Sequence, residues 1–139
     1  MRFLIVDDEM TTRKILKKTL SSFGDCDFAV NGLEAVASFE MSLEEDNPYD
    51  LIYMDIMMPV MDGLEALKKI RDIEKDRKIK PSKEVKVIMV TALGDPATMV
   101  DAYYDGGATS YLVKPVDKVK LFKKLEEIGL TAVIPVVKE

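Results

Sequence analysis

Short apolar runs alternate with helical patterns five times along this chain, and the alternation restricts the possible fold more than any other feature of the sequence. Each run has the length of a strand, and each is followed by apolar residues at helical spacing. We predict strands at residues 2–6, 26–30, 51–54, 85–90 and 110–113. This order favours a parallel sheet with helices on both faces, and right-handed crossovers make a doubly wound α/β fold the simplest arrangement.

Capping residues predict where four of the helices begin. Asn31 and Asp62 each precede a glutamate by three residues, which is the pattern of a capping box. Asp95-Pro96 predicts a fourth helix that runs to about residue 104, and Asp117 caps the last helix. We expect apolar stripes of the helices to face the sheet, among them Ile15, Leu16, Leu20 and Phe23 in the first helix and Val119, Phe122, Leu125 and Ile128 in the last.

Two segments lie outside these strands and helices. Residues 74–84 contain four lysines and one arginine, and Pro81 interrupts them, which predicts a solvated charged loop without chemistry. Residues 131–139 include several apolar side chains, and they could fold back, meet another chain or be loose. We therefore expect one domain over residues 1–130 and a C-terminal tail over residues 131–139.

The composition excludes several classes of protein. The 139 residues are enough for one domain with a core, and 47% hydrophobic and 32% charged residues are typical of a globular protein. No apolar run has the length of a membrane span, and no signal peptide precedes the first strand, so we expect a cytoplasmic protein without membrane insertion. The single Cys26 fits a reducing compartment. The net charge of −5 argues against direct nucleic-acid binding.

Carboxylates follow the first and third predicted strands. Asp7 and Asp8 come directly after the first strand, and Asp55 follows the third. If these strands are neighbours, the three carboxylates meet at the carboxyl edge of the sheet, where ligands of such folds bind. Carboxylates at this spacing repel one another unless a cation neutralises them. The chain has no histidine and one cysteine, so an all-oxygen Mg2+ site is favoured over zinc or copper.

These acids belong to a larger set of motifs that stand at the ends of successive strands. Taken together, the set resembles the receiver domain of two-component response regulators, most closely the single-domain chemotaxis (CheY-like) kind. The resemblance covers residues 2–130 and implies a flavodoxin-like fold with strand order 2-1-3-4-5. Its motifs are Asp7-Asp8, Asp55 followed by Met58-Pro59 and Asp62-Gly63, Thr91-Ala92, and Gly107-Ala108 leading to Tyr111 and Lys114-Pro115.

The resemblance implies that Asp55 accepts a phosphoryl group from a sensor histidine kinase. Mg2+ would be held by Asp8, Asp55 and the backbone carbonyl of Met57, with Asp7 acting through a water. This role suits the chemistry, because phosphoryl transfer needs positioning and charge neutralisation more than covalent help. The chain would be a phosphoacceptor that signals, and not an enzyme acting on other substrates.

The resemblance also assigns a switch. Lys114 would face the phosphoryl oxygens, and Thr91-Ala92 would contact the new group, with the Thr91 hydroxyl donating a hydrogen bond. Tyr111 would then swing inward and repack the face formed by the fourth helix, the fifth strand and the fifth helix, where a downstream effector protein docks. Only a modest bias between two forms is needed for such a switch.

Two residues depart from the family pattern, and two other functions are alternatives to the phosphoacceptor role. Met57 and Leu93 are apolar at positions where some family members orient the attacking water, so we expect slow autodephosphorylation. An aspartyl-phosphate hydrolase of the haloacid dehalogenase kind needs an aspartate at position 57 and is disfavoured. A receiver-like binding module that is never phosphorylated remains the alternative. A dinucleotide-binding fold is excluded by the absence of its glycine fingerprint.

Overall fold

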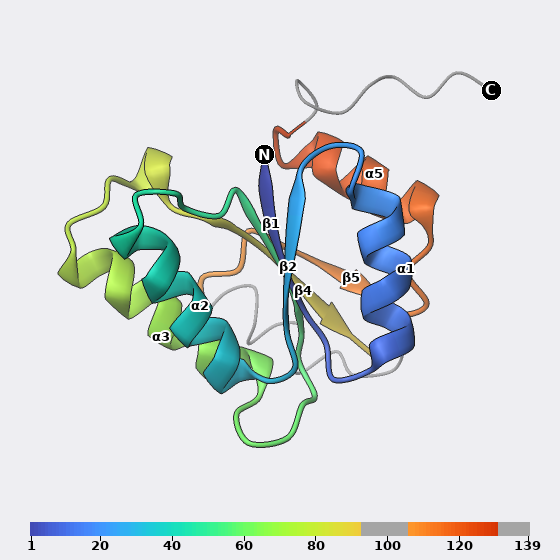
Figure 1. The fold of residues 1–139 in the computed structure, drawn as a ribbon, viewed down its shortest axis with the longest axis horizontal. Coiled ribbons are helices and arrows are strands. Elements are labelled where there is room, and N and C mark those ends of the chain that lie inside the picture. Colours follow the sequence, from blue (N-terminus) through green and yellow to red (C-terminus); the bar gives the residue numbers. More distant parts are fainter. Residues whose placement is uncertain (93–105, 131–139) are drawn as a thin grey trace.

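The structure, a computed structural model, describes residues 1–92 and 106–130. Five parallel strands form one sheet in the order β2-β1-β3-β4-β5, which confirms the predicted doubly wound α/β fold and its strand order (Figure 1). The reversal of order at β1 places a crevice between β1 and β3 at the carboxyl edge of the sheet. The strands are β1 (Arg2–Val6), β2 (Asp25–Ala29), β3 (Leu51–Asp55), β4 (Lys86–Thr91) and β5 (Ser110–Val113).

Helices cover both faces of this sheet. In Figure 1, α1 and α5 lie on one side of the strands, and α2 and α3 lie on the other. The helix predicted at residues 95–104 and the tail at residues 131–139 lie outside the described residues. No helix in the described ranges is both long and apolar enough to span a membrane. The described helices are α1 (Met10–Leu20), α2 (Gly32–Glu44), α3 (Gly63–Asp76), α5 (Lys118–Glu127) and a short 3-10 helix, η1 (Pro81–Lys83).

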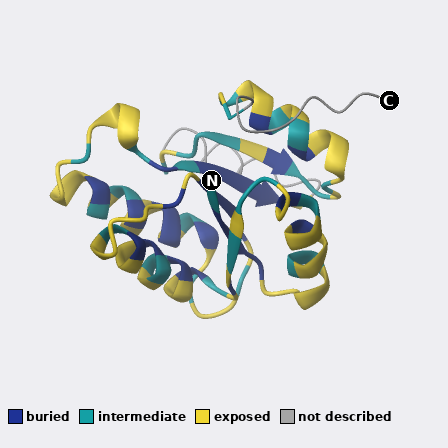
Figure 2. Ribbon diagram, turned by 45° about the horizontal axis from the view of Figure 1, so that its top comes forward, coloured by how far each residue is buried: buried dark blue, intermediate teal, exposed yellow. Residues whose placement is uncertain are grey.

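The central strands are buried on both faces, as Figure 2 shows. Side chains alternate along a strand, so each strand supplies two separate apolar clusters. Leu4 and Ile52 pack toward α2 and α3. Phe3 and Leu51 belong to the cluster under α1 and α5. This double burial explains why the strands appear in the sequence as continuous apolar runs without polar alternation.

Three of the predicted helix caps are confirmed. The side chains of Asn31, Asp62 and Asp117 each accept a hydrogen bond from the backbone N–H three residues later, at 2.8–2.9 Å. Each bond satisfies a donor that the first helical turn leaves unpaired. The caps therefore set where α2, α3 and α5 begin.

Two predicted core residues are in fact at the surface. Ile15 is 59% exposed and Val119 is 76% exposed, although both were expected to face the sheet. The buried stripes are instead Leu16 with Leu20 in α1, and a second pair one turn apart in α5, Leu121 with Leu125. Neighbouring positions on a helix differ by about 100°, so several stripes fit one apolar pattern and contact with the sheet selects among them.

The prediction of a solvated loop over residues 74–84 is wrong at its first three residues, which belong to α3. α3 continues to Asp76, and the side chain of Glu74 is only 1% exposed. One carboxylate oxygen of Glu74 pairs with Arg71 at 2.7 Å, and the other accepts the backbone N–H of Val85 at 2.8 Å. The charge is buried because both of its oxygens are satisfied. Arg71 also donates to the carbonyls of Val85 and Gly107, each at 2.9 Å, so it links α3 to β4 and to the loop before β5.

Val60, in the loop between β3 and α3, has a left-handed backbone with φ of 71° and a side chain that is 77% exposed. A β-branched residue in this region is an outlier, because its Cβ crowds the following carbonyl at a cost of about 1–2 kcal/mol. Asparagine tolerates this conformation. We therefore expect Val60→Asn to raise the free energy of unfolding by about 1 kcal/mol in urea titrations.

The matched control is Val119→Asn. This valine is equally exposed, but it lies in a regular helix and releases no strain. A gain in stability of the same size for both variants would show that surface polarity, and not the left-handed backbone of Val60, is responsible.

Candidate functional site

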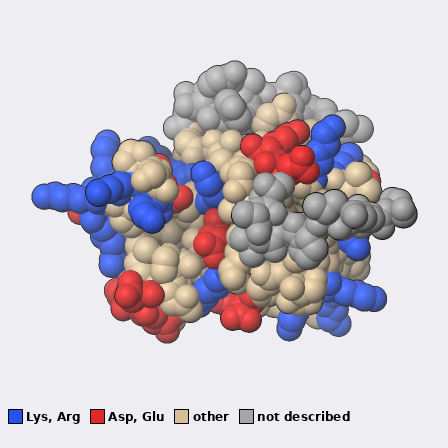
Figure 3. Space-filling model, turned by 90° about the horizontal axis from the view of Figure 1, so that it is seen from above, with Lys and Arg blue, Asp and Glu red and all other residues tan. Residues whose placement is uncertain are grey.

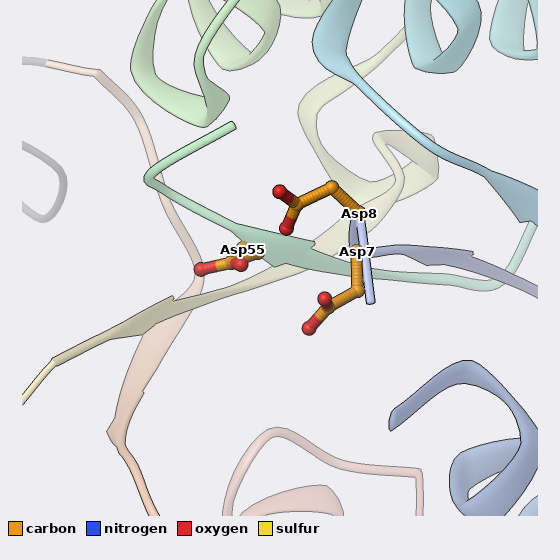
Figure 4. Close-up of side chains that lie close together, drawn as sticks. All are labelled: Asp7, Asp8 and Asp55. Carbon is orange, nitrogen blue, oxygen red and sulfur yellow. The ribbon is translucent and has the colours of Figure 1, made fainter. Parts of the chain in front are cut away.

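The three predicted acids meet at the carboxyl edge of the sheet. Val6 of β1 is paired with Met54 of β3, so the residues that follow them, Asp7 and Asp55, are neighbours. One carboxylate oxygen from each of Asp7, Asp8 and Asp55 lies within 4.8 Å of the others. Figure 4 shows the three side chains around a common point. The end of the molecule opposite to these acids is seen in Figure 3. There, basic side chains project on the left, where the end of α3 and η1 lie.

Lys114 completes the site. It follows β5, and its backbone N–H donates to the carbonyl of Thr91 at 2.8 Å, which continues the pairing of β4 and β5. Its ammonium Nζ lies 3.2 Å from Oδ2 of Asp55 and 3.8 Å from Oδ2 of Asp7. One cation thus faces two buried carboxylates that come from different strands.

Burial sets the protonation of these groups. Loss of solvation raises the pKa of Asp7 and of Asp55, and the positive charge of Lys114 offsets only part of this effect. Burial lowers the pKa of Lys114, but the charge of Asp55, the hydrogen bond to it and the charge of Asp7 outweigh that effect, so the pKa is raised. Without a further cation, the site holds more negative charge than its surroundings stabilise.

One oxygen of Asp7 indicates what the site lacks. Oδ1 accepts the backbone N–H of Glu9 at 2.9 Å, but the buried Oδ2 has no hydrogen-bond partner within the described part of the chain. An unsatisfied buried carboxylate oxygen is costly unless a cation approaches it. Three carboxylates, in a chain that has no histidine, suit a hard divalent cation such as Mg2+. The residues present therefore fit the predicted metal.

The loop after Asp55 is held by a glycine. The N–H of Gly63 donates to the carbonyl of Ile56 at 2.8 Å, and a Cβ on Gly63 would lie 2.2 Å from the carbonyl oxygen of Asp55. No side chain fits there, which gives the Asp62-Gly63 motif a structural reason. Met57 lies in this loop with its side chain exposed, so only its backbone carbonyl is a candidate ligand.

The predicted switch residues lie farther along the same edge. Thr91 is buried at the end of β4, and its hydroxyl is 3.5 Å from the carbonyl of Ala92. Tyr111 lies on β5 at the surface, where the Lys124 ammonium is 5.8 Å from its ring centre. The structure thus brings Lys114 to the acids and leaves Tyr111 on the outer edge of the sheet. Leu93 lies outside the described residues.

Sequence reasoning overlooked two residues beside the site. Arg13 donates to the carbonyl of Asp7 at 2.8 Å and ties α1 to the end of β1. Tyr53 precedes Asp55 by two residues on β3 and is 2% exposed. The two-residue spacing between Tyr53 and Asp55 could have indicated that Tyr53 lies beside the site, because residues two apart on a strand share one face.

We expect Asp7→Asn to raise the free energy of unfolding of the metal-free protein by about 1 kcal/mol at neutral pH, because it removes a buried carboxylate oxygen that accepts no hydrogen bond from the described residues. The pKa of Asp7 is higher in the folded than in the unfolded chain, so the folded state binds more protons between the two values. Wild-type stability therefore falls as the pH rises through that window. The advantage of the variant should be full above the raised pKa of Asp7 and should vanish below 3.8.

Urea titrations in EDTA at several pH values would measure this difference. Asp8→Asn is the control, because Asp8 is exposed and its replacement should change stability less. An Asp7→Asn variant that is less stable than wild type at neutral pH would contradict the expectation.

Comparison with known proteins defines the class. The response regulator receiver domain family matches residues 3–126, and the chain belongs to this family of two-component signalling proteins. Its relatives include the chemotaxis protein CheY of Listeria monocytogenes, which is 40% identical over 132 residues that cover 91% of this chain and 97% of that protein. CheY of Treponema pallidum is 34% identical over 129 residues, covering 91% of this chain and 81% of that protein.

Two solved structures are similar in fold. One is the CheX-CheY-BeF3-Mg+2 complex of Borrelia burgdorferi, with a TM-score of 0.76, 32% identity and coverage of 92% of this chain and 88% of that chain. The other contains Saccharomyces cerevisiae Ypd1, a histidine phosphotransfer protein, with the receiver domain of Ssk1, its downstream response regulator. Its TM-score is 0.80, with 32% identity and coverage of 96% of this chain and 92% of that chain.

Proposed function

We propose that this chain is a single-domain response regulator that accepts a phosphoryl group from a histidine kinase on Asp55. One observation carries the proposal: the Asp55 carboxylate lies 3.2 Å from the Lys114 ammonium and within reach of two further acids at the sheet edge. A nucleophile, a fixed positive charge and a cation site thus occupy one place. This arrangement is what phosphoryl transfer requires.

In the transfer, the nitrogen–phosphorus bond of a phosphohistidine breaks and a bond forms between a carboxylate oxygen of Asp55 and phosphorus. The electron pair of the broken bond remains on the imidazole nitrogen. Lys114 stays close to Asp55 and stabilises the negative charge on the phosphoryl oxygens. When bound, Mg2+ would neutralise further charge, held by Asp7, Asp8, Asp55 and the backbone carbonyl of Met57.

Exposed apolar side chains around the acids support docking of a protein phosphodonor. Met10 begins α1, Leu33 lies in the first turn of α2, and Met57 and Val60 lie in the loop after β3; all four are exposed. The loops before α2 and α3 are joined, because the N–H of Gly32 donates to the carbonyl of Met61 at 2.8 Å. Apolar groups gathered on one edge are typical of a protein contact. The similarity to a receiver domain crystallised with a histidine phosphotransfer protein supports a phosphodonor of this kind.

A groove between β5 and α5 supports docking of an effector. Its volume is about 320 Å³, and Tyr111 and Leu112 lie on one side of it. Three lysines, Lys120, Lys123 and Lys124, line the other side together with Glu127, which pairs with Lys124 at 2.9 Å, so the lining keeps an excess of positive charge. A basic groove on a chain with a net charge of −5 favours an acidic segment of the partner. The fourth helix, which is the third part of the predicted docking face, lies outside the described residues. We propose that the interaction takes place in the cytoplasm.

The proposal includes slow loss of the phosphoryl group. Met57, two residues beyond Asp55, offers no side-chain group that could orient an attacking water, and Leu93 is apolar as well. Acid-quenched samples of the phosphorylated protein, taken over time, would measure the decay. A half-life of a few seconds would contradict this part of the proposal.

Phosphorylation is tested by incubating the full chain with Mg2+ and phosphoramidate or acetyl phosphate and measuring the intact mass. The wild type should gain the mass of one phosphoryl group, and Asp55→Asn should gain none. EDTA should prevent the reaction. An unchanged wild-type mass would favour the alternative of a receiver-like binding module that is never phosphorylated, and equal labelling of Asp55→Asn would place the acceptor elsewhere.

A further inference from the structure

Tyr53 lies beneath two of the acids of the site. It precedes Asp55 by two residues on β3, so the two side chains share one face of the sheet. On the neighbouring strand, Tyr53 is paired with Ile5, and Asp7 follows Ile5 by two residues on that same face. Tyr53 and Ile5 both belong to the apolar cluster under α1 and α5. The phenol therefore points to the side of the sheet on which the Asp7 and Asp55 carboxylates lie.

The Tyr53 side chain borders a cavity beside the site. The residue is 2% exposed, yet it lines a cavity of about 430 Å³ between α1 and the loop after β5. Its hydroxyl makes no hydrogen bond within residues 1–92 and 106–130. In those residues, Oδ2 of Asp7 is the one fully enclosed side-chain polar atom without a partner, so the Tyr53 hydroxyl is not fully enclosed. A buried tyrosine hydroxyl usually finds a partner. The other residues that line the cavity are Glu9, Thr12, Ile15, Leu16, Lys114, Pro115 and Val116.

An acceptor of complementary chemistry lies on the same face of the sheet. Oδ2 of Asp7 is buried and accepts no hydrogen bond from the described residues. Tyr53 lines the cavity, and its hydroxyl donates to no other described residue. Lys114 does not fill the gap, because its Nζ is 3.8 Å from this oxygen and only 3.2 Å from Asp55. The charges of Asp7 and Asp55 both act on the Tyr53 phenol, which therefore lies within electrostatic range of the two acids.

We propose that Tyr53 is a positioning residue of the metal site: through one water of the cavity, its hydroxyl supplies the hydrogen bond that Oδ2 of Asp7 lacks. This bond holds the Asp7 carboxylate turned toward the cation. The cavity exceeds the space that one water needs, roughly 30 Å³, and Thr12 and Glu9 supply further polar partners for it. The inference rests on the proposed Mg2+ site.

Mg2+ titration of the full chain without a phosphodonor tests this role. We expect Tyr53→Phe to weaken Mg2+ binding about tenfold, because groups that orient metal ligands have effects of about this size. Its free energy of unfolding in EDTA should stay close to that of wild type, since the hydroxyl makes no direct hydrogen bond to another described residue. Tyr49→Phe is the matched control. The Tyr49 hydroxyl donates to Asp27 at 2.7 Å and contacts none of the three acids, so this variant should lose stability and keep its Mg2+ affinity.

A double-mutant cycle separates positioning from simple packing. If Tyr53 acts through Asp7, then Tyr53→Phe should cause no further loss of Mg2+ affinity in an Asp7→Asn background. Wild-type affinity in Tyr53→Phe, or an equal loss in both backgrounds, would overturn the inference. Failure of the proposed function would look different: Asp55 would take up no phosphoryl group even if the Mg2+ cycle gave the expected coupling.

Discussion

Lys114→Met is expected to slow the phosphorylation of Asp55 by phosphoramidate roughly 10²-fold, because removal of one preorganised positive group from a developing anion has effects of this order. The Nζ of Lys114 lies 3.2 Å from Asp55 and also faces Asp7. Its loss leaves two buried carboxylates without a protein cation. The pKa of Asp55, already raised by burial, should then rise further, since the charge of Lys114 lowers it. Fewer molecules would carry the nucleophilic carboxylate at neutral pH.

Initial rates of mass labelling at saturating Mg2+ would measure this effect. Lys69→Met is the control, because Lys69 is an exposed lysine of α3 and its replacement removes the same charge from the chain. Lys114→Arg should restore only part of the rate, because a planar guanidinium cannot replace a compact ammonium between two carboxylates. Labelling of Lys114→Met at the wild-type rate would contradict the proposed role of this residue.

Arg71→Met is expected to lower the free energy of unfolding by about 3–5 kcal/mol, the usual cost of leaving a buried charge without its partner. Arg71 neutralises Glu74, whose side chain is 1% exposed, and donates to the carbonyls of Val85 and Gly107. Methionine fills similar space but provides no donor. The variant therefore removes the Arg71 hydrogen bonds to one carboxylate and two carbonyl oxygens at the junction of α3, β4 and the loop before β5.

Urea unfolding in the absence of Mg2+ would measure this loss. Arg77→Met is the matched control, because Arg77 pairs with Glu44 at 3.7 Å between two exposed side chains, and such pairs contribute at most about 1 kcal/mol. The double variant Arg71→Met with Glu74→Met should recover much of the stability, because no buried charge remains. Equal losses for Arg71→Met and Arg77→Met would show that burial of Glu74 carries little energy.

The sheet and the acids of the site could be predicted because their signals are local. Each central strand is buried on both faces and appears as an apolar run, and Asp7, Asp8 and Asp55 stand where such runs end. Parallel pairing then brings them together without further information. Lys114 could be placed for the same reason, since it follows the fifth run.

What sequence reasoning missed depends on contacts between distant segments. Glu74 lies in a charged stretch and is buried only because Arg71 and the N–H of Val85 meet it there. Ile15 and Val119 fit apolar patterns, but contact with the sheet buries Leu16 and Leu121 in their place. Tyr53 lies in a run of buried residues, so the sequence indicates only a packing role for its phenol. The cavity beside Tyr53 is seen only in the structure.

The contact of Arg71 with Gly107 also provides a built-in reporter. The Arg71 Nε–H donates to the carbonyl of Gly107, three residues before β5 begins, and Gly107 has a left-handed φ of 81°. Any displacement of that loop stretches or breaks this bond. The nitrogen-15 resonance of the Arg71 side chain should therefore register rearrangement of the β5 edge from the opposite side of the sheet, without a label on the docking face itself.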